Sequence, residues 1–132
     1  MFVQGCFTIE KNIRGLTIRE IELRLGFRTG RLTHGARIIA LDREPTVHEF
    51  EPLGSTRFAN GTGLSKTDLH ASKFIPGAWL GERLIKVEPI LPHSAFEWYP
   101  PSPTGAEQWK LTGLITGHEI CQLKAGQTYW GR

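Results

Sequence analysis

The alternation of apolar and polar residues predicts a chain built mainly of short strands. Residues 2–9 are rich in aromatic and β-branched side chains and end at a polar break, residues 10–12, so we expect a first strand there. The apolar run at residues 36–41 predicts a buried strand. Further strands are predicted at residues 55–59, 83–91, 108–114, 119–123 and 127–130.

One helix is signalled clearly, directly after the first strand. Thr17 and Glu20 have the spacing of a capping box, in which each side chain bonds to the backbone N–H of the other residue. Gly26 is expected to end the helix after about two turns. The apolar face of this helix carries Ile18, Ile21 and Leu25. We therefore expect a short amphipathic helix that packs on the sheet.

The distribution of turn residues fixes the predicted fold class. The chain has 15 glycines and eight prolines, too many for a helical bundle. Residues 45–51 are expected to form a short helical turn, with Thr46 as its cap and Glu49 three residues later. Residues 60–72 are the best candidate for a mobile loop. No repeat or linker divides the sequence, so we predict one β-dominated α+β domain over residues 1–132.

The net charge of +3 is concentrated in the first third of the chain. Residues 1–43 carry eight Lys or Arg against four Asp or Glu. Such a series of arginines either faces a phosphate group or forms a solvated surface with local glutamate partners. Nucleic acid is disfavoured as a partner, because the four tryptophans that could stack on bases lie in the other half of the chain.

No targeting or membrane segment is recognised. The longest apolar runs are far shorter than the roughly 20 residues that cross a bilayer, and the first residues lack the pattern of a secretory signal. We expect a cytoplasmic protein, or export by a route that needs no such signal. Cys6 and Cys121 are predicted to be buried reduced thiols, and a disulfide is the alternative if the terminal strands pair.

Most common catalytic motifs are missing. Residues 60–67 resemble a phosphate-binding loop, but Asn60 and Ser65 replace the two glycines that such a loop requires. None of the five histidines has the spacing of a metal-binding pair. There is no G-x-S-x-G elbow for a nucleophilic serine. A covalent serine or cysteine mechanism and a local metal site are both disfavoured.

The strongest candidate for chemistry is the segment at residues 99–112. A stiff proline-rich stretch meets Gly105 and then leads Gln108 and Trp109 into a predicted strand. A polar side chain held at such a junction is well placed for binding or catalysis.

Three segments, read in order, resemble the small NAD glycohydrolase family of the tuberculosis necrotizing toxin. They are residues 31–43, with the pattern R-L-x-x-G before a strand, residues 54–58, with an arginine between a glycine and an aromatic residue, and residues 84–109. The last segment is similar to the family's approach to a Gln-Tyr pair, although this chain has Trp109 in place of the tyrosine.

The resemblance implies an NAD-cleaving or ADP-ribosyl-transferring toxin domain, with NAD as substrate and with no cofactor or metal. It implies that Gln108 and Arg57 are catalytic residues. It also implies a set of NAD-binding residues, namely Arg43, Arg37, Ser55 and Trp109. An inhibitor or immunity protein is the expected partner. The alternative is a non-catalytic binding module that uses the arginine-rich N-terminal third.

Overall fold

The computed structural model of the chain describes residues 1–46, 48–52, 81–90 and 108–131. In this structure, the first predicted strand is divided in two. β1 (Phe2–Val3) and β2 (Cys6–Ile9) are separated by a bend at Gly5, whose φ of 80° lies in the left-handed region that favours glycine. The expectation of one continuous strand at residues 2–9 is therefore wrong, because the bend turns the two halves toward different neighbours.

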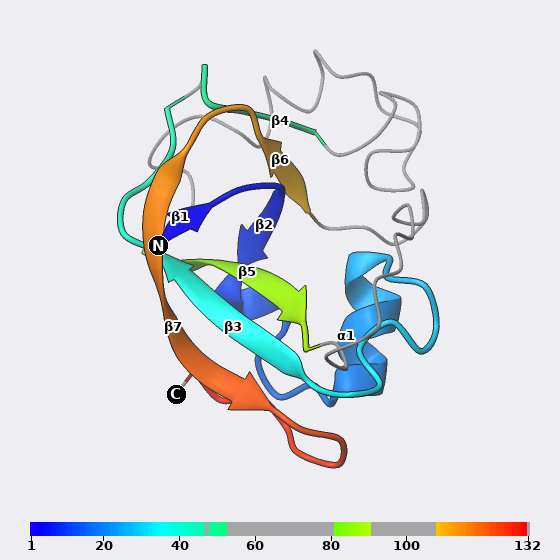
Figure 1. Cartoon of the computed structure of the whole chain (residues 1–132). Coiled ribbons are helices and arrows are strands. Elements are labelled where there is room, and N and C mark those ends of the chain that lie inside the picture. Colours follow the sequence, from blue (N-terminus) through cyan, green and yellow to red (C-terminus); the bar gives the residue numbers. More distant parts are fainter. Residues whose placement is uncertain (47, 53–80, 91–107, 132) are drawn as a thin grey trace.

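Seven antiparallel strands form one sheet in the described part of the chain. The remaining strands are β3 (Ala36–Leu41), β4 (Phe50–Pro52), β5 (Leu84–Pro89), β6 (Trp109–Leu111) and β7 (Ile115–Leu123). Their order is β1-β7-β3-β5-β2-β6-β4. Since β1 and β2 follow each other in the chain but lie first and fifth in this order, the sheet curls back toward itself (Figure 1).

The predicted helix is present as α1 (Ile18–Leu25). The Thr17 hydroxyl accepts a hydrogen bond from Glu20 N at 3.3 Å, and Glu20 Oε1 accepts one from Thr17 N at 2.9 Å, which completes the capping box. Gly26 ends the helix in the left-handed conformation, with φ 78°. A strand-dominated domain with one α-helix in its described residues confirms the α+β class.

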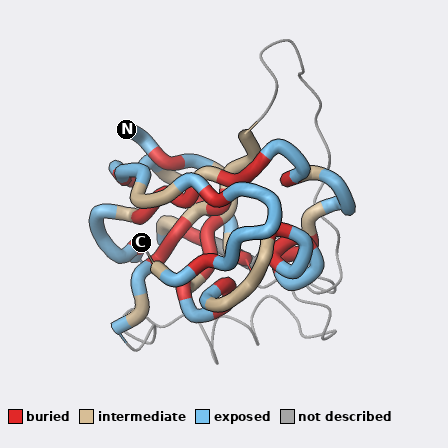
Figure 2. The backbone as a smooth tube through the Cα atoms, turned by 90° about the horizontal axis from the view of Figure 1, so that it is seen from below, coloured by how far each residue is buried: buried red, intermediate tan, exposed pale blue. Residues whose placement is uncertain are grey.

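The core has two parts, one on each face of the curled sheet. The first cluster consists of Val3, Phe7, Ile39, Phe50, Leu84, Leu111 and Ile115. The second combines Ile18, Ile21 and Leu25 of α1 with strand residues that include Ile38, Ile85, Val87 and Leu123. Neighbouring residues of β3 and β5 contribute to opposite clusters, as the alternation of side chains along a strand requires. Figure 2 shows the buried segments at the centre of the fold.

Four other predicted elements differ from expectation or lie outside the described residues. Glu49 N bonds to Thr46 O at 2.9 Å, which closes a turn, but the chain enters β4 at Phe50 and does not form a helix there. At the C-terminal end, Thr128 makes only an isolated bridge to Thr17. The predicted strand at residues 55–59 and the loop at 60–72 lie outside the described residues.

Within the described residues, no helix has the length and apolar character needed to cross a membrane.

Candidate functional site

Gln108 is a buried polar residue that joins the start of β6 to the end of α1. Its side chain is 4% exposed, and its Nε2 donates a hydrogen bond to Leu25 O at 3.1 Å. The last carbonyl groups of a helix have no partner within the helix, so this contact satisfies one of them. The side-chain amide of Gln108 therefore has a structural role in the geometry observed here.

Trp109 follows Gln108 and packs on the first core cluster. Its ring centroid lies 5.9 Å from that of Phe7, at an interplanar angle of 38°, and Phe7 in turn meets Phe50 edge to face at 6.0 Å. β6 pairs Trp109 with Phe7 across the sheet. The indole is thus part of an aromatic cluster.

Arg43 forms a two-pronged ion pair with Glu49 just beyond the end of β3. Arg43 Nη1 lies 2.8 Å from Glu49 Oε1, and Nη2 lies 2.8 Å from Oε2. The hydrogen bonds from Arg43, and then the one from Thr46 N, lower the pKa of Glu49 to about 2. The guanidinium is held in a geometry that suits a carboxylate or a phosphate, and here a carboxylate of the protein occupies it.

Arg37 lies on β3 and faces Glu119 of β7. Its Nε is 3.0 Å from Glu119 Oε1, as an ion pair without the alignment of a hydrogen bond. Arg57 and Ser55, the other two residues implied by the resemblance, lie outside the described residues. Each of the four described candidates thus has its own contact within the protein: Gln108 with Leu25, Arg43 with Glu49, Arg37 with Glu119, and Trp109 with the Phe7 ring. Among the described residues, no group of three His, Cys, Asp or Glu side chains could hold a metal ion.

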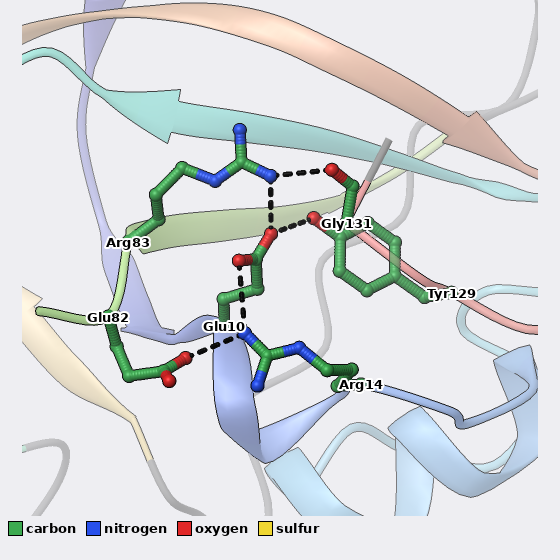
Figure 3. A network of polar contacts seen from close by, with 6 residues as sticks. All are labelled: Glu10, Arg14, Glu82, Arg83, Tyr129 and Gly131. Atoms are coloured by element: carbon green, nitrogen blue, oxygen red, sulfur yellow. Dashed lines mark hydrogen bonds and ion pairs between the residues drawn. The ribbon is translucent and has the colours of Figure 1, made fainter.

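A buried carboxylate, Glu10, is the centre of a polar network that the sequence did not indicate (Figure 3). Glu10 is 6% exposed. Its Oε2 accepts hydrogen bonds from Arg83 Nη2 at 2.7 Å and from the Tyr129 hydroxyl at 2.5 Å, and its Oε1 accepts one from Arg14 Nη2 at 3.3 Å. Arg83 also donates to Gly131 O at 2.6 Å. The network ties the C-terminal segment to the 3-10 turn that follows β2 (Glu10–Asn12) and to the residue that precedes β5.

Electrostatics keep the Glu10 carboxyl ionised. Burial alone would raise its pKa, but the hydrogen bonds from Arg83, Tyr129 and Arg14 outweigh burial and lower it. For Tyr129, burial and the contact with Glu10 both raise the pKa. Glu10 and Tyr129 thus keep the charge states that their hydrogen bond requires, an ionised acceptor and a neutral donor.

A second buried carboxylate, Glu22, shapes the loop that follows α1. Glu22 is 2% exposed, and it accepts hydrogen bonds from Gly30 N at 3.2 Å and from Leu32 N at 2.7 Å. A buried polar side chain needs such hydrogen-bond partners, and the two backbone donors supply them. In the sequence, Glu22 is an ordinary helix glutamate, and its burial was not predicted.

One side of α1, together with the turn at Ala125 and Gly126, borders a small hollow. The hollow has a volume of about 230 Å³ and is lined by Thr17, Ile18, Arg19, Glu22, Thr33, Ala125 and Gly126. On the same helix, the Arg19 side chain is 67% exposed and Leu23 is 68% exposed. None of the sequence-predicted site residues lines this hollow.

Comparison of the chain with protein-family models, with curated proteins and with solved structures finds no match.

Proposed function

We propose that this chain is a non-catalytic binding module that contacts a partner protein through its arginine-rich N-terminal third. The observation that supports this proposal is that the described candidate groups are already bonded within the protein. The Gln108 amide bonds to Leu25 O, Arg43 grips Glu49, and Arg37 pairs with Glu119. Such a group must give up its internal partner before it can hold a substrate, which costs free energy.

The thiols also favour a binding role over covalent chemistry. Cys6 and Cys121 are both free. Burial raises the pKa of the Cys6 thiol and outweighs the nearby Lys86 and Lys110, and burial with the charge of Glu119 raises the pKa of Cys121. Neither thiol is activated as a nucleophile. Two free thiols fit a reducing compartment, and we propose the cytoplasm.

The second candidate function is cleavage of NAD at the bond between nicotinamide and ribose. It is supported by the family resemblance of the sequence and by the fixed position of Gln108, which stands directly after residues 91–107 and is held by Leu25. This reaction passes through an oxocarbenium-like centre and needs no nucleophile of the protein. Arginine forks such as Arg43 and Arg57 would neutralise the pyrophosphate, and an amide would orient the ribose or a water.

One assay separates the two functions. The purified chain is incubated with NAD, and released nicotinamide is quantified. We expect no release above the buffer blank from the folded wild-type protein. Turnover that falls at least tenfold in both Arg43→Ala and Arg57→Ala would overturn the binding-module proposal and establish the NAD-cleaving function.

The variants are chosen so that loss of activity can be told from loss of fold. Arg43 is 51% exposed and pairs with Glu49 at the surface, so Arg43→Ala should leave the fold intact. Gln108→Ala removes a buried hydrogen bond, so its activity is interpreted only if its circular dichroism spectrum matches that of the wild type. Arg19→Gln is the matched control, because Arg19 is a surface arginine outside the proposed NAD site.

A further inference from the structure

The outer face of α1 presents an exposed leucine beside an exposed arginine. Ile18, Ile21, Glu22 and Leu25 of this helix are buried, whereas Arg19 and Leu23 are 67% and 68% exposed. Residues four positions apart lie next to each other on a helix surface, so the Arg19 and Leu23 side chains are neighbours. This pair combines an apolar contact with a positive charge at one place on the surface.

The two glutamates of α1, Glu20 and Glu22, are committed to contacts within the described part of the chain. Of the four arginines in residues 18–31, Arg24, Arg28 and Arg31 also have interaction partners. The Glu20 carboxylate accepts hydrogen bonds from Thr17 N and Thr17 Oγ1, at 2.9 and 3.0 Å. The Glu22 carboxylate is buried against the backbone of Gly30 and Leu32. The exposed guanidinium of Arg19 is therefore the group on this surface that is complementary to a negatively charged partner.

Arg19 keeps most of its hydrogen-bonding capacity. Within the described residues, its guanidinium makes one ion-pair contact, with Glu22 Oε1 at 4.0 Å, which is too long for a hydrogen bond. A guanidinium has five N–H donors in a planar fork that fits a carboxylate with two bonds. Arg19 is thus available to hold an aspartate or glutamate side chain of a partner.

The hollow beside Arg19 offers a place for a partner side chain. Its walls come from three segments: Thr17, Ile18, Arg19 and Glu22 at α1, Thr33 of the following loop, and the turn at Ala125 and Gly126. The volume of about 230 Å³ gives room for one side chain, whose apolar contacts would be with Ile18 and Ala125.

We infer that the α1 docking surface, defined as Arg19, Leu23 and the adjoining hollow, binds an acidic peptide segment of a partner protein that carries one apolar anchor residue. The inference rests on the binding module proposed above and names the chemistry of its partner. A protein segment is favoured over nucleic acid because Leu23 places an apolar side chain next to the cationic one, and a phosphate backbone gains nothing from that contact.

The test uses a phage-displayed library of random twelve-residue peptides, selected against the full chain. Enriched peptides are synthesised and their dissociation constants measured by fluorescence anisotropy with wild type, Arg19→Gln and Leu23→Gln. Lys110→Gln and Leu114→Gln are matched controls, because they make the same changes of charge and polarity at other exposed positions. Single-stranded dT12 is measured in parallel as the nucleic-acid probe.

We expect enriched peptides with Asp or Glu around an apolar residue, and an affinity that falls at least tenfold in Arg19→Gln and in Leu23→Gln but less than twofold in the controls. Enriched peptides that bind both α1 variants as tightly as the wild type would overturn the assignment of this surface but not the proposal of a binding module. A library that yields no binder would overturn both. Tighter binding of dT12 than of any peptide, with loss in Arg19→Gln, would replace the acidic peptide by nucleic acid.

Discussion

Tyr129 and Glu10 are 119 residues apart in the chain, and the Tyr129 hydroxyl donates a hydrogen bond of 2.5 Å to Glu10 Oε2 (Figure 3). Tyr129 is 1% exposed and Glu10 is 6% exposed, so the contact is made away from water. The backbone on either side is fixed as well, since Gly15 N bonds to Tyr129 O and Tyr129 N bonds to Leu16 O. The C-terminal segment is thereby part of the folded core.

Tyr129→Phe should destabilise the protein by about 1.5–3 kcal/mol, the range for a hydrogen bond to a charged group. The ring stays in place, and the buried Glu10 carboxylate loses one of its donors. The free energy of unfolding is measured in urea. Trp130→Phe is the control, because the Trp130 N–H bonds to Thr128 Oγ1 at an exposed position. A loss below about 0.5 kcal/mol in Tyr129→Phe would contradict the assigned role of the hydroxyl.

Glu10 should also make stability depend on pH. Its pKa is lower in the folded protein than the ordinary value of 4.5, because the hydrogen bonds of Arg83, Tyr129 and Arg14 outweigh the effect of burial. The ionised carboxylate therefore stabilises the fold fully above about pH 4.5, and this contribution disappears as the pH falls through the folded pKa.

Urea unfolding of wild type and Glu10→Gln between pH 7 and pH 2 measures this effect. We expect the wild type to lose more stability than the variant below pH 4.5. Parallel curves for the two proteins across this range would refute the contribution of Glu10.

Gly117→Ala should destabilise the sheet where β1 pairs with β7. A Cβ at this position would lie 2.5 Å from Ala40 O and 2.6 Å from Val3 Cγ2, so the backbone would have to move. Overpacking of this kind costs about 1–3 kcal/mol. Gly113→Ala is the matched control, since its nearest neighbour would be Glu49 Oε2 at 3.9 Å. Thermal unfolding of both variants checks the prediction, and equal midpoints would show that β1 does not pack there.

Glu22→Gln should loosen the loop that follows α1. The carboxylate accepts from both Gly30 N and Leu32 N, and the amide nitrogen of glutamine cannot accept. We expect a loss of about 1–3 kcal/mol and faster hydrogen exchange at the amides of Gly30 and Leu32. Glu20→Gln is the control, because Glu20 caps the helix at an exposed position. Unchanged exchange at both amides would show that the loop is held by other contacts.

The candidate site could be predicted from the sequence only in part. The prolines and the glycine before Gln108 and Trp109 predict that both residues enter a strand; Trp109 does begin β6, and Gln108 directly precedes it. Their partners were not predictable, because Leu25 O and the Phe7 ring come from distant segments that meet only when β6 pairs with β2. The same holds for Arg37, whose partner Glu119 depends on the register of β3 and β7, which shifts between Ile38 and Ile39.

The sequence by itself determined the elements whose signals are local. The helix from Ile18 to Leu25 begins and ends through Thr17, Glu20 and Gly26, all within one turn of its ends. The buried strand at residues 36–41 is signalled by the apolar run of residues 38–41. Only the tertiary structure decided that the first strand bends at Gly5, that Glu10 and Glu22 are buried, and that the described arginines meet particular glutamates. The reason is that a cap depends on neighbours three or four residues away, whereas a buried charge is stabilised only after distant strands and loops have come together around it.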